Sequence, residues 1–143
     1  MSAIFDIQTR EFSIDDYEAA IELWKRVEGL DLAEGDDRET IRRFLQQNRG
    51  LSRVAMRGPT MVGAVLCGHD GRRGYIYHLA VDPADQGRGF ARRLIDECLA
   101  GLKRAGLERA NILVAKDNSR GRDFWRRCGW EDLDEAAAMG RDV

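Results

Sequence analysis

The residues best suited to chemistry lie in the segment Gln86-Gly87-Arg88-Gly89-Phe90-Ala91. It joins an apolar, β-prone run at 74–81 to a helical run at 88–105. The first turn of a helix has backbone N–H groups without intrahelical acceptors, and with the positive end of the helix dipole these favour a phosphate. Three arginines add positive charge where the dipole disfavours cations, namely Arg88, Arg92 and Arg93. The segment therefore predicts a binding loop for a pyrophosphate.

The spacing of the glycines separates this loop from other phosphate-binding loops. The chain has no GxxxxGK[ST] string, and Gly87 and Gly89 lack the third small residue of a dinucleotide fingerprint. The segment matches Q/R-x-x-G-x-G/A instead, and it is followed by Asp117-Asn118 and by Phe124-Trp125-Arg126-Arg127-Cys128-Gly129-Trp130. With these segments the chain resembles the GNAT family of N-acetyltransferases over essentially its whole length, and within it small stand-alone bacterial acetyltransferases.

The resemblance implies an α/β fold with a mixed, mostly antiparallel central sheet of about six to seven strands flanked by four helices. The hydrophobic periodicity agrees with the order β-α-α-β-β-β-α-β-α-β(β). Strands are expected at 3–10, 51–57, 61–68, 75–81 and 110–115, with one or two more in the tail at 130–143. Helices are expected to begin after Ser13 and after Asp36 or Asp37, and to span 88–105 and 119–128.

The resemblance also implies a reaction, the transfer of acetyl from acetyl-CoA to a primary amine by direct attack within a ternary complex. The acceptor is a small-molecule or protein amine that the sequence does not identify. The pantetheine arm is expected along Leu79, Ala80 and Val81, with the backbone N–H of Leu79 polarising the thioester carbonyl. The other expected cofactor-binding residues are Gln86, Gly87, Arg88, Gly89, Phe90, Ala91, Arg92, Asn118 and Trp125. A catalytically weak module that binds CoA or acetyl-CoA in a sensor or regulatory role is the alternative.

The residues for proton transfer depart from the family pattern. The position of the usual tyrosine acid holds Trp125, whose indole N–H has no useful acidity. Tyr77 and Cys128 remain as candidate acids for the departing thiolate. The positions of two glutamate bases found in other members hold Tyr75 and Leu113. The general base must therefore come from elsewhere in the chain.

His78 is one candidate for this base, because an imidazole titrates near neutral pH. An isolated histidine is more often structural, and strand alternation places His78 on the face opposite Tyr77, against a helix. Three acidic residues in the connection after the first helix are alternative bases, namely Glu28, Asp31 and Glu34.

Length and composition are those of one globular domain spanning 1–143. Eleven acidic and three basic residues lie between Glu11 and Glu39, whereas eleven basic and five acidic residues lie between Arg88 and Arg127. The basic part fits an anionic cofactor. The acidic part either attracts a cationic amine or simply reflects helix starts. The basic residues are too dispersed to indicate nucleic acid.

No apolar run approaches the roughly 20 residues of a membrane span, and no signal peptide is recognisable, so a cytoplasmic protein is expected. Three cysteines are expected to be reduced thiols, namely Cys67, Cys98 and Cys128. With two histidines and no CxxC pair, no metal site is expected. The resemblance implies that the protein is either a monomer or a homodimer.

Overall fold

The computed structural model describes residues 6–143, so the predicted start of the first strand at 3–5 lies outside the described residues. The chain divides into two compact units, one ending at Leu113 and the other spanning Val114–Val143. The first unit contains the sheet and the helices α1 to α3, and the second contains α4 and the tail. One domain over 1–143 stays a prediction.

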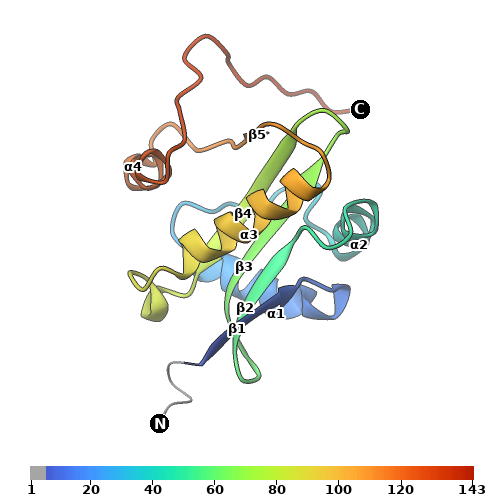
Figure 1. Cartoon of the computed structure of the whole chain (residues 1–143), viewed down its shortest axis with the longest axis vertical. Coiled ribbons are helices and arrows are strands. Elements are labelled where there is room, and N and C mark those ends of the chain that lie inside the picture. Colours follow the sequence, from blue (N-terminus) through green and yellow to red (C-terminus); the bar gives the residue numbers. More distant parts are fainter. Residues whose placement is uncertain (1–5) are drawn as a thin grey trace. The chain divides into compact units, whose positions relative to one another are not determined.

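A five-stranded sheet in the order β1-β2-β3-β4-β5 forms the centre of the first unit (Figure 1). Its strands are β1 (Ile7–Glu11), β2 (Arg53–Arg57), β3 (Thr60–His69), β4 (Gly74–Val81) and β5 (Ala110–Asn111). The first four pair antiparallel with their neighbours, and β5 pairs parallel with β4. Almost all of β3 is buried because helices cover both faces of the sheet there, so its sequence is a continuous apolar run.

Helices α1 (Tyr17–Arg26) and α2 (Arg38–Gln47) contribute to one hydrophobic cluster on one face of the sheet. The predicted capping box before α1 is present, since the Ser13 N–H donates to Asp16 Oδ2 at 2.9 Å beside the short 3-10 helix η2 (Ile14–Asp16). The side chain of Asp37 caps α2 by accepting from the Thr40 N–H at 3.1 Å. Both predicted helix starts are confirmed.

Helix α3 (Phe90–Arg104) packs against the opposite face of the sheet, where it crosses β2, β3 and β4 (Figure 1). The approach is close enough to require glycine in the sheet. A Cβ added at Gly74 would lie 2.4 Å from Leu102 Cδ1, and one added at Gly63 would lie 3.1 Å from Leu94 Cδ1. These contacts determine how closely α3 lies on β3 and β4.

The number of strands differs from the prediction, because the described residues form five strands rather than six or seven. The tail at 130–143 forms no strand, and all side chains after the half-buried Trp130 are exposed, so they give no alternating buried face. The predicted strand at 110–115 is reduced to β5. Leu113 is 76% exposed, so the apolar run there is not buried as a strand.

The three cysteines are free, as expected, with Cys67 and Cys98 buried and Cys128 partly exposed. A hydrogen bond with Cys67, together with burial, raises the pKa of Cys98 far above that of an ordinary thiol. Among residues 6–143, no group of three His, Cys, Asp or Glu side chains is arranged to hold a metal ion. No helix in the same part of the chain has the length and apolarity needed to cross a membrane.

Candidate functional site

The predicted pyrophosphate loop connects the end of β4 to the first turn of α3 through the 3-10 helix η3 (Pro83–Asp85). Gly87 and Gly89 have φ values of 81° and 87°, which L side chains rarely adopt. Gly89 is the N-cap of α3, and the first turn contains no acidic residue. A Cβ at either glycine would meet nothing within 4 Å, so the backbone here is open to a ligand. These features favour an anion at the helix N-terminus.

Polar contacts hold this loop in place on both sides. The Asp82 carboxylate accepts from the Ala84 N–H at 3.0 Å and pairs with Arg26 of α1 at 2.8 Å. The Ala84 hydrogen bond and the Arg26 guanidinium keep the pKa of Asp82 below its usual range. Gln86 Nε2 donates to the Val81 carbonyl at 3.0 Å, which ties the loop to the end of β4.

A second ion pair supports the middle of the loop. The buried Asp85 carboxylate pairs with Arg57 of β2, and Arg88 lies 3.8 Å from the same carboxylate oxygen. The Arg88 side chain is 53% exposed, so it can turn toward a ligand while the backbone of the loop stays fixed. The loop is therefore preorganised by residues from α1, β2 and β4.

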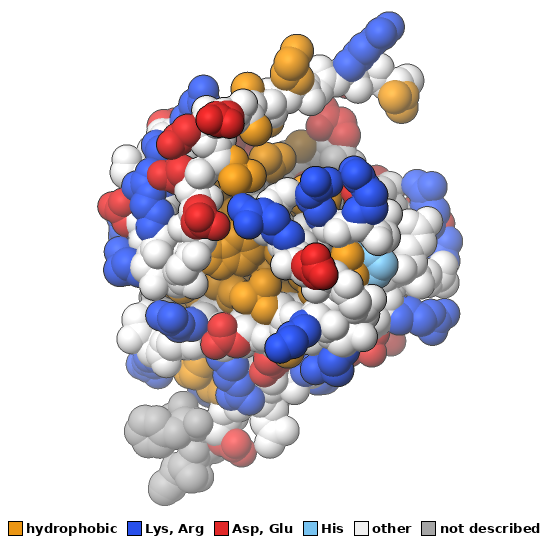
Figure 2. Space-filling view, turned by 45° about the horizontal axis from the view of Figure 1, so that its top comes forward, with side chains coloured by type: hydrophobic (Ala, Val, Ile, Leu, Met, Phe, Trp, Pro, Cys, Tyr) orange, Lys and Arg blue, Asp and Glu red, His pale blue; other side chains and the backbone are white. Residues whose placement is uncertain are grey.

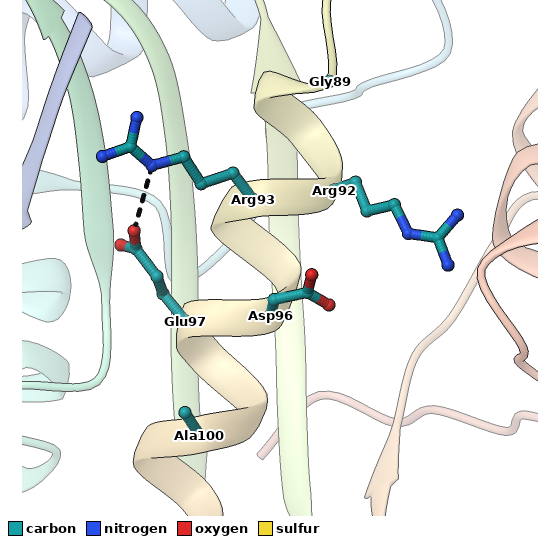
Figure 3. Close-up of a pocket in the computed structure, with 6 residues that line it drawn as sticks. All are labelled: Gly89, Arg92, Arg93, Asp96, Glu97 and Ala100. Atoms are coloured by element: carbon teal, nitrogen blue, oxygen red, sulfur yellow. Dashed lines mark hydrogen bonds and ion pairs between the residues drawn. The ribbon is translucent and has the colours of Figure 1, made fainter.

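A depression of about 420 Å³ lies along the exposed side of α3 and begins at Gly89 (Figure 3). Arg93 points to Glu97 with 3.4 Å between Nε and Oε2, and its guanidinium also donates to the Ile7 carbonyl at 3.3 Å. Arg92 points the other way and makes no hydrogen bond or ion pair within residues 6–143. Of the two, Arg92 has a guanidinium available to an anion, whereas that of Arg93 is engaged in the fold.

Charged side chains of both signs are interspersed over the face seen in Figure 2. Several arginines of the basic segment pair with acids of the same segment, as Arg93 does with Glu97 and Arg126 with Asp123. The charge asymmetry counted along the sequence is therefore partly neutralised by local ion pairs. The positions of Arg88 and Arg92 beside the helix N-terminus therefore support anion binding better than the net charge of the segment does.

A β-bulge interrupts β4 at His78 and Leu79. Ala64 of β3 pairs with Ala80 and Leu66 pairs with Tyr77, so two residues of β4 lie opposite one residue of β3. His78 has a φ of 52° and is the only described residue other than glycine with a positive φ. Such backbone strain in a non-glycine residue concentrates at functional sites.

The bulge corrects the predicted orientation of His78. Alternation placed it on the face opposite Tyr77, but both rings lie on the face covered by α1 and α2. Tyr77 contacts Phe44 of α2 with ring centroids 6.0 Å apart, and His78 contacts Trp24 of α1 at 5.0 Å. The extra residue shifts the alternation by one position, which no pattern within β4 alone reveals.

The bulge also brings His78 beside Asp36, with 2.9 Å between Nε2 and Oδ1. Sequence reasoning missed Asp36 as a partner, since the two residues are 42 positions apart and neither belongs to a motif. The alternative bases named from the sequence, namely Glu28, Asp31 and Glu34, are all exposed. Tyr77 is 38% exposed, and burial of its ring raises the pKa of its phenol.

The other edge of β4 is largely open. β4 pairs with β5 only through Gly74 and Tyr75, so from Ile76 to Val81 it has no strand partner on that side within the described residues. This open edge includes the predicted pantetheine strand, Leu79 to Val81.

Asn118 and Trp125 lie in the second unit. The Asn118 side chain accepts from the Gly121 N–H at 3.0 Å and caps α4 (Ser119–Arg127). Trp125 makes edge-on contacts with Phe124 at 5.7 Å and with Trp130 at 5.0 Å between ring centroids. Both residues therefore have structural partners in their own unit, and their predicted cofactor contacts remain predictions.

The comparisons with known proteins define the class to which this fold and site belong. The model of the Acetyltransferase (GNAT) family matches residues 3–130. The protein therefore belongs to the acetyltransferase (GNAT) family, and the resemblance inferred from the sequence is confirmed. A protein of Yersinia pestis (strain Pestoides F), named acetyltransferase, is 36% identical to this chain over 128 residues, which are 90% of each chain.

Solved structures confirm the α/β fold. The PaiA N-acetyltransferase from Thermoplasma acidophilum, in complex with coenzyme A, superposes with a TM-score of 0.74 at 18% identity over 86% of this chain and 88% of that one. The structure of AAC(6')-Iy in complex with the bisubstrate analog CoA-S-monomethyl-acetylneamine gives a TM-score of 0.76 at 16% identity, over 96% and 99%. At these identities the similarity concerns the fold.

Proposed function

We propose that the protein is an N-acetyltransferase that transfers acetyl from acetyl-CoA to a primary amine within a ternary complex. The observation that carries this proposal is the preorganised loop between β4 and α3, with two positive-φ glycines and an unneutralised helix N-terminus. The family membership supports acetyl transfer, and the two structural relatives that bind CoA or a CoA analog support the cosubstrate.

The binding roles follow from the contacts of the loop. The backbone N–H groups from Gly87 to Arg92 would hold the pyrophosphate, with Arg88 and Arg92 supplying charge-assisted hydrogen bonds. The open edge of β4, from Leu79 to Val81, would receive the pantetheine as an added strand. Phe90 and Ala91 begin α3 and complete this loop.

The reaction requires three events at the bulge of β4. The amine lone pair forms a C–N bond to the thioester carbon while the carbonyl oxygen gains negative charge, and then the C–S bond breaks. The Leu79 N–H, displaced from the regular ladder by the bulge, would stabilise the developing oxyanion. Tyr77 is our candidate for the proton donor to the thiolate, since burial keeps its phenol protonated.

The test is amine-dependent release of CoA thiol from acetyl-CoA by the purified protein, with products identified by mass spectrometry. A panel of cationic amines, amino acids and peptides would define the acceptor class. Release that depends on one class of amine supports the proposal. A cofactor-induced rise in melting temperature without release for any amine would contradict it and favour the weakly catalytic CoA-binding module.

A further inference from the structure

The strained residue of β4 is held by a contact with a different element. His78 Nε2 lies 2.9 Å from Asp36 Oδ1, and the side chains are only 21% and 15% exposed. The imidazole also packs on the buried Trp24 ring at 5.0 Å, tilted by 54°. The Trp24 Nε1–H has no acceptor within residues 6–143. A buried donor without a partner is costly, so the strained histidine lies beside a second unfavourable feature of the fold.

Asp36 is itself fixed by its surroundings. Its second oxygen, Oδ2, accepts from the Ala33 N–H at 2.9 Å, and its backbone carbonyl accepts from the Tyr17 hydroxyl at 2.6 Å. The next residue, Asp37, caps α2 through Thr40. The carboxylate oxygen that faces the imidazole is therefore held in place by α1, by the connection between the helices and by the start of α2.

This contact determines which nitrogen of His78 carries a proton. A carboxylate accepts hydrogen bonds, so Nε2 donates to Asp36 and, in the neutral ring, the lone pair lies on Nδ1. Orientation and tautomer are two things that a carboxylate supplies to a catalytic histidine.

We propose that His78 is the general base of the acetyl transfer and that Asp36 is the residue that positions it. This inference rests on the proposed function. His78 Nδ1 takes a proton from the ammonium form of the acceptor, so that an N–H bond breaks and an Nδ1–H bond forms. The freed amine lone pair then attacks the thioester carbon, and the imidazolium, paired with Asp36, releases its proton to solvent.

The variant His78→Asn tests the base. Asparagine tolerates a positive φ and places its amide near the position of Nδ1, but it cannot take up a proton at neutral pH. We expect kcat to fall by about 10²- to 10⁴-fold, the range for a general base, while the Kd for acetyl-CoA measured by calorimetry stays unchanged. A kcat within about twofold of the parent protein's would overturn the base assignment.

The variant Asp36→Asn tests the positioning residue. One amide has a single oxygen, so it cannot accept from both Ala33 and His78, and it presents N–H to the imidazole if it keeps the Ala33 bond. We expect kcat to fall, as in His78→Asn, while the Kd for acetyl-CoA stays unchanged. The exposed acid Glu22, whose ion pair is with Lys25, provides the matched control Glu22→Gln, for which we expect no change.

Nitrogen-15 NMR of the His78 ring tests the positioning role of Asp36 separately from the proposed function. The parent protein is expected to show the proton on Nε2, and Asp36→Asn to lose this preference. An unchanged tautomer in Asp36→Asn, or a proton on Nδ1 in the parent protein, would overturn the positioning role whatever the activity. Absence of amine-dependent thiol release by the parent protein would instead refute the proposed function and, with it, the base role of His78.

Discussion

The pair of variants Gly89→Asp and Gly89→Asn tests the pyrophosphate loop by changing one charge. Gly89 caps α3 with a φ of 87°, and a Cβ there would meet no atom within 4 Å. Asparagine and aspartate are the residues most tolerant of such a conformation after glycine, and they have nearly the same shape. The two variants therefore carry the same backbone strain, and they differ in the carboxylate placed at the helix N-terminus.

The expected loss of CoA affinity comes from the repulsion between the added carboxylate and a phosphate bound next to it. Two unit charges 4 Å apart interact by about 1 kcal/mol in bulk water and about 4 kcal/mol near a protein surface. The site is open, so we expect a loss of about 1–3 kcal/mol, which is about 5- to 150-fold in Kd. A carboxylate at an N-terminus also stabilises the helix dipole, so weaker binding by Gly89→Asp cannot arise from unfolding of α3.

The assay is calorimetric titration of each variant with CoA at two salt concentrations. The titration is repeated with pantetheine, the part of CoA that has no phosphate. Gly89→Asp should bind CoA more weakly than Gly89→Asn, and the difference should shrink at higher salt. Pantetheine, which has no pyrophosphate, should bind both variants equally. Equal CoA affinities for the two variants at low salt would refute the placement of the pyrophosphate on this loop.

Three further predictions concern the fold. Gly74→Ala should lower the free energy of unfolding by about 1–3 kcal/mol in a denaturant titration, because its Cβ would lie 2.4 Å from Leu102 Cδ1. Burial acts to raise the pKa of Asp16, but the interactions with Arg10 and Ser13 together lower it, so its contribution to stability is present above about pH 4 and lost on acidification. Asp16→Asn should therefore show a shallower loss of stability at acid pH, and an unchanged slope would contradict this. Cys128 should react with maleimide in the native protein, observed by intact mass, before the two buried cysteines, and labelling of all three at equal rates would be inconsistent with the structure.

The sequence was sufficient to predict features that depend on neighbouring residues. The cap of α2 was predicted at Asp36 or Asp37 and is Asp37, and Ser13 forms the predicted box before α1 with Asp16, each within a few positions of the residues that revealed it. Such local rules need no knowledge of the partner strand. The position of the loop between β4 and α3 followed from the change of periodicity at Val81.

The bulge of β4 and its consequences could not be predicted in this way. A bulge is defined by counting residues on two strands, and the irregular pairing lies between Ala64 and Leu66 on β3. The pattern within β4 alone gave ordinary alternation, which put His78 on the face opposite Tyr77. The expected packing of His78 against a helix is confirmed by its contact with Trp24 of α1. Its contact with Asp36 spans 42 residues and depends on how the connection between α1 and α2 folds over the sheet.

In the proposed mechanism, His78 held by Asp36 of this connection takes the place of a glutamate base in the sheet. Tyr75 stacks on Tyr77 with ring centroids 6.1 Å apart, and Leu113 is 76% exposed, so neither glutamate position of related acetyltransferases supplies an acid here. Asp36 reaches the bulge from outside the sheet and meets the imidazole there. The contact between His78 of β4 and Asp36 forms only when the connection between α1 and α2 holds its folded conformation. In the proposed mechanism, an acceptor that contacts this connection therefore influences the position of the base as well as its own binding, which links the choice of acceptor to the rate of transfer.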